Sequence, residues 1–306
     1  MGRLPTRVIR VGSAREEPRL YVSNNECANY VTLSHCWGGV KPLITTTDTL
    51  EARTTCIPYD TLPKTFQDAV MITRSLGVEY LWIDSLCIIQ DSVDDWAKEA
   101  ASMKDVYADC YVMISADDSP NPHGGCLPVY EQPSRQSFVV NTVGPKLSKI
   151  CHRIGDAQSI DESRSTLNQR GWCLQERILA PRVLHFGQSE LAWECPEMVA
   201  CECQTVATSL DKESRYKAMR GDHLLRQAQG SPKQSLVGGS KVDILLWMNF
   251  VEEFTRRHLT FNKDILHALA GLAAFMEAVT GAEYVHGIWK RELAEFLLWT
   301  THKGTT

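Results

Sequence analysis

The residues best suited to chemistry follow two predicted strands in the first third of the chain. Tyr30–Leu33 is apolar and β-prone, and residues 34–39, Ser-His-Cys-Trp-Gly-Gly, come directly after it. A second strand, Tyr80–Asp84, ends on an aspartate. Ligands of open α/β sheets bind outside the carboxyl ends of the strands, so both segments are expected at one edge of a sheet.

These residue types suit a nucleotide. The backbone amides of Gly38 and Gly39 can meet a phosphate, and the Trp37 ring can stack on a base. Asp84 can hold a ribose hydroxyl or orient His35. The competing interpretation is structural: Trp37 anchors the core, the glycines make a turn, and Asp84 caps a helix or pairs with an arginine.

A thiol nucleophile is a second possible chemistry. Cys36 or Cys87, with His35 as base and Asp84 as orienting acid, would supply a nucleophile and its activating partners. Adjacent side chains of a strand point to opposite faces, so His35 and Cys36 pair poorly. Cys87 with His35 remains open.

The cysteines also allow a metal site. Cys195, Cys201 and Cys203, with His185 upstream, offer three or four zinc ligands, but their C-x5-C-x-C spacing departs from the usual C-x2-C pair. The chain has 11 cysteines, several within apolar runs. Reduced, buried thiols in a cytosolic protein are therefore the simpler expectation, and no metal is assigned.

Alternating strands and helices must position these residues. A helix is expected after Pro63 and up to Gly77, and a second from about residue 94 to 110. Tyr111–Ala116 is the third strand. This order predicts an α/β fold with a parallel sheet flanked by helices, and the nearly continuous apolar strands are typical of sheets buried on both faces.

Weaker patterns surround this core. Residues 1–29 are predicted to be a polar lead-in with one edge strand near Arg7–Val11. Residues 117–168 are irregular, apart from possible strands near Phe138–Val143 and Lys149–Ile154. A short helix over Gln169–Leu179 and a hairpin, Arg182–Phe186 with Glu190–Glu194, are expected next.

The remainder is predicted to be a helical C-terminal region. A polar linker, 204–240, precedes helices at about 242–258, 263–278 and 284–302. The tryptophans expected in its core are Trp247, Trp289 and Trp299. Three histidines without a ligand pattern are expected to be structural, namely His258, His267 and His286.

Composition limits the function classes. The 306 residues include 32 Lys+Arg and 37 Asp+Glu, a formal net charge of −5, which argues against a dedicated nucleic-acid binder. No stretch reaches the ~18 apolar residues needed to span a membrane. The N-terminus lacks the apolar run of a secretory signal, so a cytoplasmic location is expected.

Three sequence blocks resemble a known family. They are residues 30–38 (YVTLSHCWG), 62–69 (LPKTFQDA) continuing to 81–91 (LWIDSLCIIQD), and 170–177 (RGWCLQER). In this order they resemble the fungal heterokaryon incompatibility (HET) domain over about residues 30–203. The tail, including residues 257–264 (RHLTFNKD), is also similar to such proteins. The resemblance implies a TIR-like, flavodoxin-like sheet and a role in nonself recognition and programmed cell death.

The TIR comparison implies a catalytic residue. Plant-type TIR domains carry a Trp-Cys-Leu-x-Glu helix whose glutamate cleaves NAD, and residues 172–176 read Trp-Cys-Leu-Gln-Glu. Glu176 is therefore the expected catalytic carboxylate, with NAD as substrate and no separate cofactor. The resemblance also implies activation by homo-oligomerisation and an upstream recognition protein. Residues 117–168 depart from the TIR pattern as an insertion that could cover the pocket.

Other expected pocket residues follow the strands or flank the Glu176 helix. They are Ser34, His35, Trp37, Gly38, Gly39, Asp84, Ser85, Cys87, Gln90, Arg170, Trp172 and Arg177. The alternative for Glu176 is a surface glutamate paired with Arg170, Arg177 or Arg182. The alternative functions are a non-catalytic module acting by homotypic assembly and a thiol-dependent enzyme of secondary metabolism.

Overall fold

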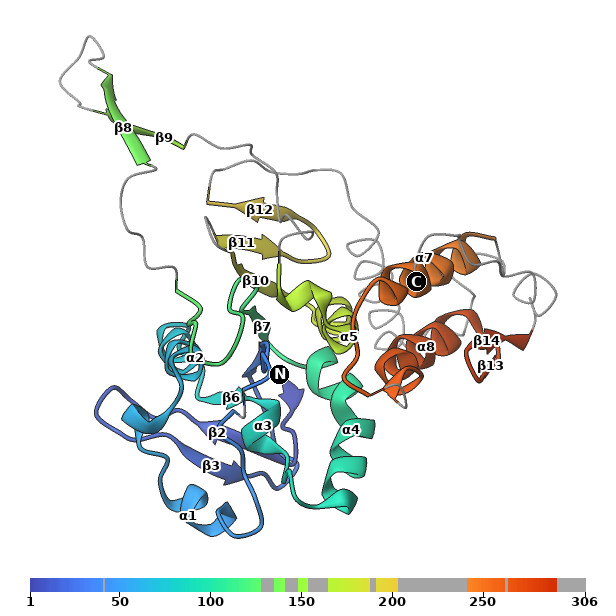
Figure 1. Ribbon diagram of the computed structural model, residues 1–306, viewed down its shortest axis with the longest axis horizontal. Coiled ribbons are helices and arrows are strands. Elements are labelled where there is room, and N and C mark those ends of the chain that lie inside the picture. Colours follow the sequence, from blue (N-terminus) through green and yellow to red (C-terminus); the bar gives the residue numbers. More distant parts are fainter. Residues whose placement is uncertain are drawn as a thin grey trace.

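A mixed β-sheet forms the centre of the computed structural model (Figure 1). The structure describes residues 1–40, 42–127, 135–140, 148–153, 165–187, 191–202, 241–261 and 264–290. Within these residues the sheet has eight strands in the order β12-β11-β10-β7-β5-β6-β2-β3.

Four parallel strands occupy the middle of the sheet: β5 (Tyr30–Ser34), β6 (Tyr80–Trp82), β7 (Val112–Ser115) and β10 (Val183–Phe186). Numbered along the chain, they lie in the order 2-1-3-4, which is the order of flavodoxin-like sheets. The predicted α/β class and its parallel core are confirmed.

Antiparallel strands extend the parallel centre of the sheet on both sides. The strands β2 (Arg7–Arg10) and β3 (Arg19–Val22) follow β6, and β11 (Leu191–Glu194) and β12 (Val199–Cys201) follow β10. Short connections allow only antiparallel neighbours, because a parallel pair needs a longer crossover. The strand predicted at the edge, β2, lies inside the sheet, and β3 forms the edge.

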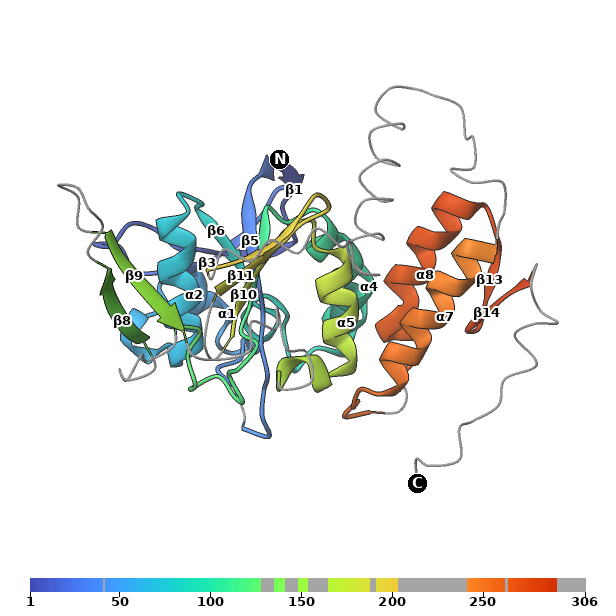
Figure 2. The ribbon, with the colours of Figure 1, turned by 90° about the horizontal axis from the view of Figure 1, so that it is seen from above.

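Helices cover the sheet on both faces (Figure 2). On one face lies α2 (Lys64–Ser75), and on the other lie α4 (Val93–Ala108) and α5 (Gly171–Leu179). Gly77 ends the α2 segment with a φ of 67°, which a glycine adopts without strain. The side chain of Ser92 accepts a hydrogen bond from the Asp95 amide and begins α4.

Smaller elements complete this part of the chain. The helix α1 (Leu50–Thr55) packs against β3, and the single turn α3 (Asp84–Cys87) follows β6. The predicted strand Tyr80–Asp84 therefore ends at Trp82, and Asp84 begins the helical turn. The remaining short elements are β1 (Gly2–Arg3), β4 (Cys27–Ala28), η1 (Tyr59–Thr61), η2 (Leu167–Gln169) and the hairpin β8 (Arg135–Val140) with β9 (Ser148–Arg153).

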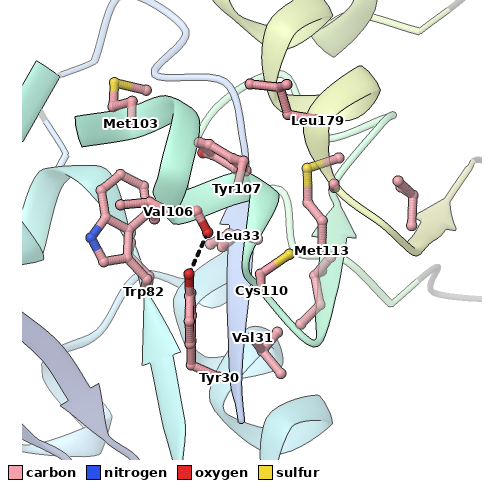
Figure 3. Close-up of a cluster of buried hydrophobic side chains, with 14 of the residues drawn as sticks. Tyr30, Val31, Leu33, Trp82, Met103, Val106, Tyr107, Cys110, Met113 and Leu179 are labelled. Atoms are coloured by element: carbon pink, nitrogen blue, oxygen red, sulfur yellow. Dashed lines mark hydrogen bonds between the residues drawn. The ribbon is translucent and has the colours of Figure 1, made fainter. Parts of the chain in front are cut away.

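The core between α4 and the sheet holds large side chains (Figure 3). The Tyr30 hydroxyl donates to the Val106 carbonyl at 2.7 Å, and the Trp82 and Tyr107 rings meet edge to face at 5.6 Å. Burying each large apolar side chain stabilises the fold by about 1.5–3 kcal/mol. Of the predicted apolar face of α4, Met103 and Tyr107 are buried here, whereas Trp96 is 36% exposed.

The C-terminal region packs on α5 through α8 (His267–Thr280), with α7 (Lys241–Thr255) beside it (Figure 2). The Gly271 amide donates to Gln175 Oε1 at 2.8 Å. A Cβ at Gly271 would lie 2.7 Å from that oxygen and from Lys104 Cβ, so the close approach of α8 requires glycine.

A small aromatic core closes this region, with Trp247, Tyr284 and Trp289 rings 5.1–5.3 Å apart. The predicted burial of Trp247 and Trp289 is confirmed. The helix predicted over 284–302 is wrong at its start, where β13 (Tyr284–Val285) and β14 (Ile288–Trp289) form a hairpin. Its two turn residues both have positive φ, as a type I′ turn requires. The rest of that predicted helix, Trp299 and the predicted linker 204–240 lie outside the described residues.

Candidate functional site

A pocket of about 720 Å³ opens outside the carboxyl ends of β5 and β6. Its volume lies within the range of small-molecule sites. The loops after β5 and β6, the first turns of α4 and α5, and residues 258–264 of the C-terminal region form its walls. The polar and aromatic lining residues are Trp37, Asp84, Gln90, Asp91, Ser92, Trp96, Arg170, Trp172, Glu176, His258, Thr260, Phe261 and Asp264.

Glu176 lies in the wall contributed by α5 and is only 6% exposed. The Ser34 hydroxyl, at the end of β5, donates to Glu176 Oε2 at 2.5 Å. Burial raises the pKa of Glu176, while Arg170 and the Ser34 hydrogen bond act in the opposite direction. The result is a carboxylate held in one orientation by the sheet and poorly solvated.

Arg170 precedes α5 and brings a positive charge to the same wall. Its guanidinium donates to the His35 carbonyl, which fixes the loop after β5 to the start of α5. Burial alone would lower the pKa of Arg170, but the neighbouring acidic groups Cys173, Glu176 and Asp84 outweigh it and raise the pKa. Arg170 is therefore the counter-charge of the pocket carboxylates.

Asp84 ties the two strand-end loops together. The Trp37 indole nitrogen donates to Asp84 Oδ2 at 3.1 Å, and the Ser85 amide donates to Asp84 Oδ1 at 2.7 Å. Gln90 Nε2 donates to the Asp84 carbonyl at 3.1 Å. The Asp84 carboxylate therefore accepts hydrogen bonds both from the first turn of α3 and from the Trp37 ring.

The two glycines after Trp37 have left-handed backbones, with φ of 59° at Gly38 and 69° at Gly39. A Cβ at Gly38 would lie 2.1 Å from the Pro120 carbonyl oxygen. Glycine is therefore required at position 38 by both conformation and space. Both glycines line the pocket.

Seven of the expected binding residues line this one pocket together with Glu176, namely Trp37, Gly38, Gly39, Asp84, Gln90, Arg170 and Trp172. Five others do not: Ser34, His35, Ser85, Cys87 and Arg177. Ser34 still touches the site through its bond to Glu176.

His35 lies behind the pocket wall and is 2% exposed. Its ring meets Phe66 edge to face at 5.0 Å, and its Nδ1 is 3.9 Å from Asp84 Oδ1. Burial lowers the pKa of His35 to about 4, against the opposing effect of Asp84. The imidazole is therefore neutral near pH 7.

The thiols near the site are poor nucleophiles. Burial raises the pKa of Cys87 to about 12, and it also raises the pKa of Cys36 and Cys173. A thiolate is the reactive form, so these environments oppose thiol catalysis.

Cys201 forms a disulfide, contrary to the expectation of reduced thiols throughout. In the part of the chain that the structure describes, no group of His, Cys, Asp and Glu residues could hold a metal ion.

Arg177 belongs to a separate buried network on the far side of α5. Its Nε donates to Glu194 Oε2 at 2.9 Å. His185 bridges the same Glu194 oxygen, at 2.9 Å from Nε2, and Asp117 Oδ2, at 2.8 Å from Nδ1. His185, one of the possible zinc ligands, thus lies between two carboxylates. Arg182, one of the possible partners of Glu176, instead donates to the Tyr111 carbonyl.

The sequence patterns did not predict that residues of the C-terminal region, His258 to Phe261 and Asp264, line the pocket. His258 pairs with the segment before α5: its amide donates to the Gln169 carbonyl at 2.6 Å, and its carbonyl accepts from the Gly171 amide at 2.8 Å. A Cβ at Gly171 would lie 2.6 Å from Leu259 Cδ2. The sequence block at residues 257–264 resembles the family, but the resemblance did not indicate that this block lies beside α5 in the pocket wall.

Comparison with known proteins gives one match. No curated protein and no solved structure matches the chain. No helix in the described residues is long and apolar enough to cross a membrane. Residues 30–176 match the family model described as heterokaryon incompatibility protein (HET), which supports a role in heterokaryon incompatibility, and the matched segment ends at the pocket glutamate.

Proposed function

We infer that this chain is a HET-type effector of cell death that hydrolyses the nicotinamide–ribose bond of NAD, with Glu176 as the catalytic carboxylate. The observation that carries the proposal is the position of Glu176. It is a buried carboxylate in the wall of a nucleotide-sized pocket, held by Ser34 at the end of β5.

Cleavage of the nicotinamide–ribose bond needs few catalytic groups besides such a carboxylate. The bond between ribose C1′ and the ring nitrogen breaks, and its electron pair stays on the nitrogen, so nicotinamide leaves as a neutral molecule without acid assistance. Positive charge develops on C1′ and its ring oxygen, as in glycoside hydrolysis. Water then adds to C1′ and loses a proton, which gives ADP-ribose.

Glu176 suits the stabilisation of this positive charge. A preorganised carboxylate in a site with little water interacts with a cation more strongly than it would in bulk solvent. The Ser34 hydroxyl holds Oε2, and a side-chain hydrogen bond with Tyr107 also favours the ionised form of the carboxylate. The ionised form is required, and Arg170 favours it against the effect of burial.

The other residues of the pocket are of the chemical types that bind nucleotides. Trp37 and Trp172 contribute partly exposed aromatic surface, and the glycines at 38 and 39 place exposed backbone at the mouth. Aromatic faces bind planar rings by stacking, and backbone amides bind phosphate oxygens. We therefore expect a substrate with a ring, a ribose and a phosphate.

The test is nicotinamide release from NAD by the purified full chain. Glu176→Gln keeps the volume of the side chain and removes its charge, and we expect it to lower kcat at least about 100-fold, as loss of one charge-stabilising group does elsewhere. Glu79→Gln is the matched control, because Glu79 is half-exposed and pairs with Arg10 away from the pocket.

Protein concentration is varied in the same assay, because activation by homo-oligomerisation is expected. No nicotinamide release at any concentration, from chain shown to be assembled, would overturn the enzymatic proposal in favour of a non-catalytic assembly module. Activity that survives Glu176→Gln but is lost on thiol alkylation would instead support the thiol-dependent alternative.

A further inference from the structure

A carboxylate of the C-terminal region, Asp264, lies in the pocket wall outside the segment that matches the family model. It is 7% exposed. Among the residues that the structure describes, its side chain has no hydrogen-bond or ion-pair partner. Arg257, the cation at the start of this segment, pairs with Glu253 at 2.9 Å.

The other pocket carboxylates are already engaged. Asp84 accepts from Trp37 and Ser85, and Glu176 accepts from Ser34. Asp91 accepts from the Thr47 amide at 2.9 Å and the Thr47 hydroxyl at 2.7 Å. Asp264 is the one of the four whose carboxylate has no hydrogen-bond or ion-pair partner in the described part of the chain, so a ligand in the pocket can supply one.

The charge of the described pocket wall indicates which kind of ligand this is. It contains Asp84, Asp91, Glu176 and Asp264 against the single guanidinium of Arg170. Such a wall attracts a cation and repels a pyrophosphate. Of the two ends of NAD, the nicotinamide ring is a positively charged pyridinium, whereas the adenine is neutral.

We propose that Asp264 is the residue that recognises the pyridinium cation, so that the nicotinamide-ribosyl end lies inside the pocket and the pyrophosphate lies toward its mouth. This inference rests on the proposed function and adds to it a specificity-determining residue supplied by the C-terminal region. Asp264 binds the charge of the ground state, which disappears as the ring leaves. Its contribution therefore falls on substrate binding and not on stabilisation of the transition state.

The segment that carries Asp264 is well positioned for this task. It is hydrogen-bonded through His258 to both residues that flank Arg170, and Leu259 packs on Gly171 at the first turn of the Glu176 helix. These contacts join the stretch that precedes Asp264 to the first turn of the Glu176 helix. The two carboxylates then act on the two sides of the bond that breaks.

The experiment compares two small probes by NMR titration: the 1-methylnicotinamide cation, which cannot be cleaved, and neutral nicotinamide. We expect the wild-type chain to bind the cation at least 10-fold more tightly than the neutral amide. Asp264→Asn should reduce this ratio to about 1, and Asp264→Glu should restore it in part. Glu252→Gln, which removes an exposed carboxylate on α7, is the matched control and should leave the ratio unchanged.

Steady-state kinetics with NAD give the second readout. Asp264→Asn should raise KM about 10-fold and raise kcat by a similar factor, so that kcat/KM changes less than 2-fold, because the binding that is lost exists in the ground state and not in the transition state. Asp264→Ser is the substitute if Asp264→Asn does not fold. A wild-type chain without preference for the cation, or a folded variant that keeps the preference, would overturn the proposal.

The two proposals fail in different ways. NAD cleavage that depends on Glu176 but is indifferent to Asp264 would contradict only the role of Asp264. Preference for the cation that depends on Asp264, in a chain that does not cleave NAD, would contradict the enzymatic proposal and leave Asp264 as a cation-recognition residue.

Discussion

At the scale of single residues, the site combines two buried ionisable groups whose environments oppose their charged forms. Burial raises the pKa of Glu176 and lowers that of His35 to about 4. Only Glu176 lies in the pocket wall, so the two groups have different consequences. The first affects catalysis and stability, and the second affects stability alone.

Glu176→Gln is expected to stabilise the fold while it removes activity. The folded-state pKa of Glu176 is above its unfolded value, so the wild type loses stability as pH rises through the folded-state pKa and the buried carboxylate ionises. The variant does not pay this cost. Its unfolding midpoint in urea should exceed that of the wild type at pH 8, and the difference should vanish at pH 4; a lower midpoint at pH 8 would contradict the described burial.

His35 should make the protein sensitive to acid. Its folded-state pKa of about 4 lies below the ordinary 6.5, so its contribution is fully present above pH 6.5 and is lost as pH falls toward 4. The loss amounts to about 3 kcal/mol at 1.36 kcal/mol per pKa unit. His35→Gln should flatten the dependence of unfolding free energy on pH between 7 and 4. An unchanged slope would show that other groups cause the acid sensitivity.

At the scale of elements, two faces of α5 have different roles. One presents Glu176 to the pocket, and the other anchors the helix to the hairpin β10–β11 through Arg177, Glu194 and His185. Burial would lower the pKa of His185, but Asp117 and Glu194 outweigh it and raise the pKa. This histidine therefore contributes stability below pH 6.5 that is lost as pH rises through its folded-state pKa.

Arg177→Met tests this anchor. The substitution keeps much of the apolar stem and removes the buried guanidinium that pairs with Glu194, while His185 still bridges Glu194 and Asp117. Removing one partner of a buried ion pair costs about 3–5 kcal/mol, and we expect a loss of this size in the free energy of unfolding. Arg256→Met on the exposed face of α7 is the control and should change stability by less than about 1 kcal/mol.

At the scale of the whole molecule, hydrophobic patterning predicted much of the fold. The order of strands and helices from Tyr30 to Ser115 and the β10–β11 hairpin agree with the apolar runs and turn residues. The antiparallel pairing of β2 with β3 and β6, and of β12 with β11, was not predicted, because local patterns do not say which strands become neighbours. The hairpin at 284–289 was mistaken for a helix, since its two-residue turn uses His286 and Gly287 rather than the usual Asn-Gly.

The candidate site was predictable where residues follow strands and unpredictable where the chain returns from a distance. Trp37 and Asp84 follow adjacent strands, so their meeting at 3.1 Å was foreseeable from topology. His35 and Cys87 also follow strands but turn into the core, which alternation alone did not indicate. The segment that leads to Asp264 reaches the pocket through the pairing of His258 with Arg170, and such a long-range pairing leaves no local pattern in the sequence.

Nicotinamide release from NAD by the assembled chain, with Glu176→Gln and Glu79→Gln measured in parallel, shows directly whether Glu176 is the catalytic carboxylate. We expect release by the wild type and by Glu79→Gln, a fall of at least about 100-fold for Glu176→Gln, and activity that declines toward acid pH as Glu176 takes up a proton. Equal rates for wild type and Glu176→Gln, or no release from any of the three, would contradict this role of Glu176.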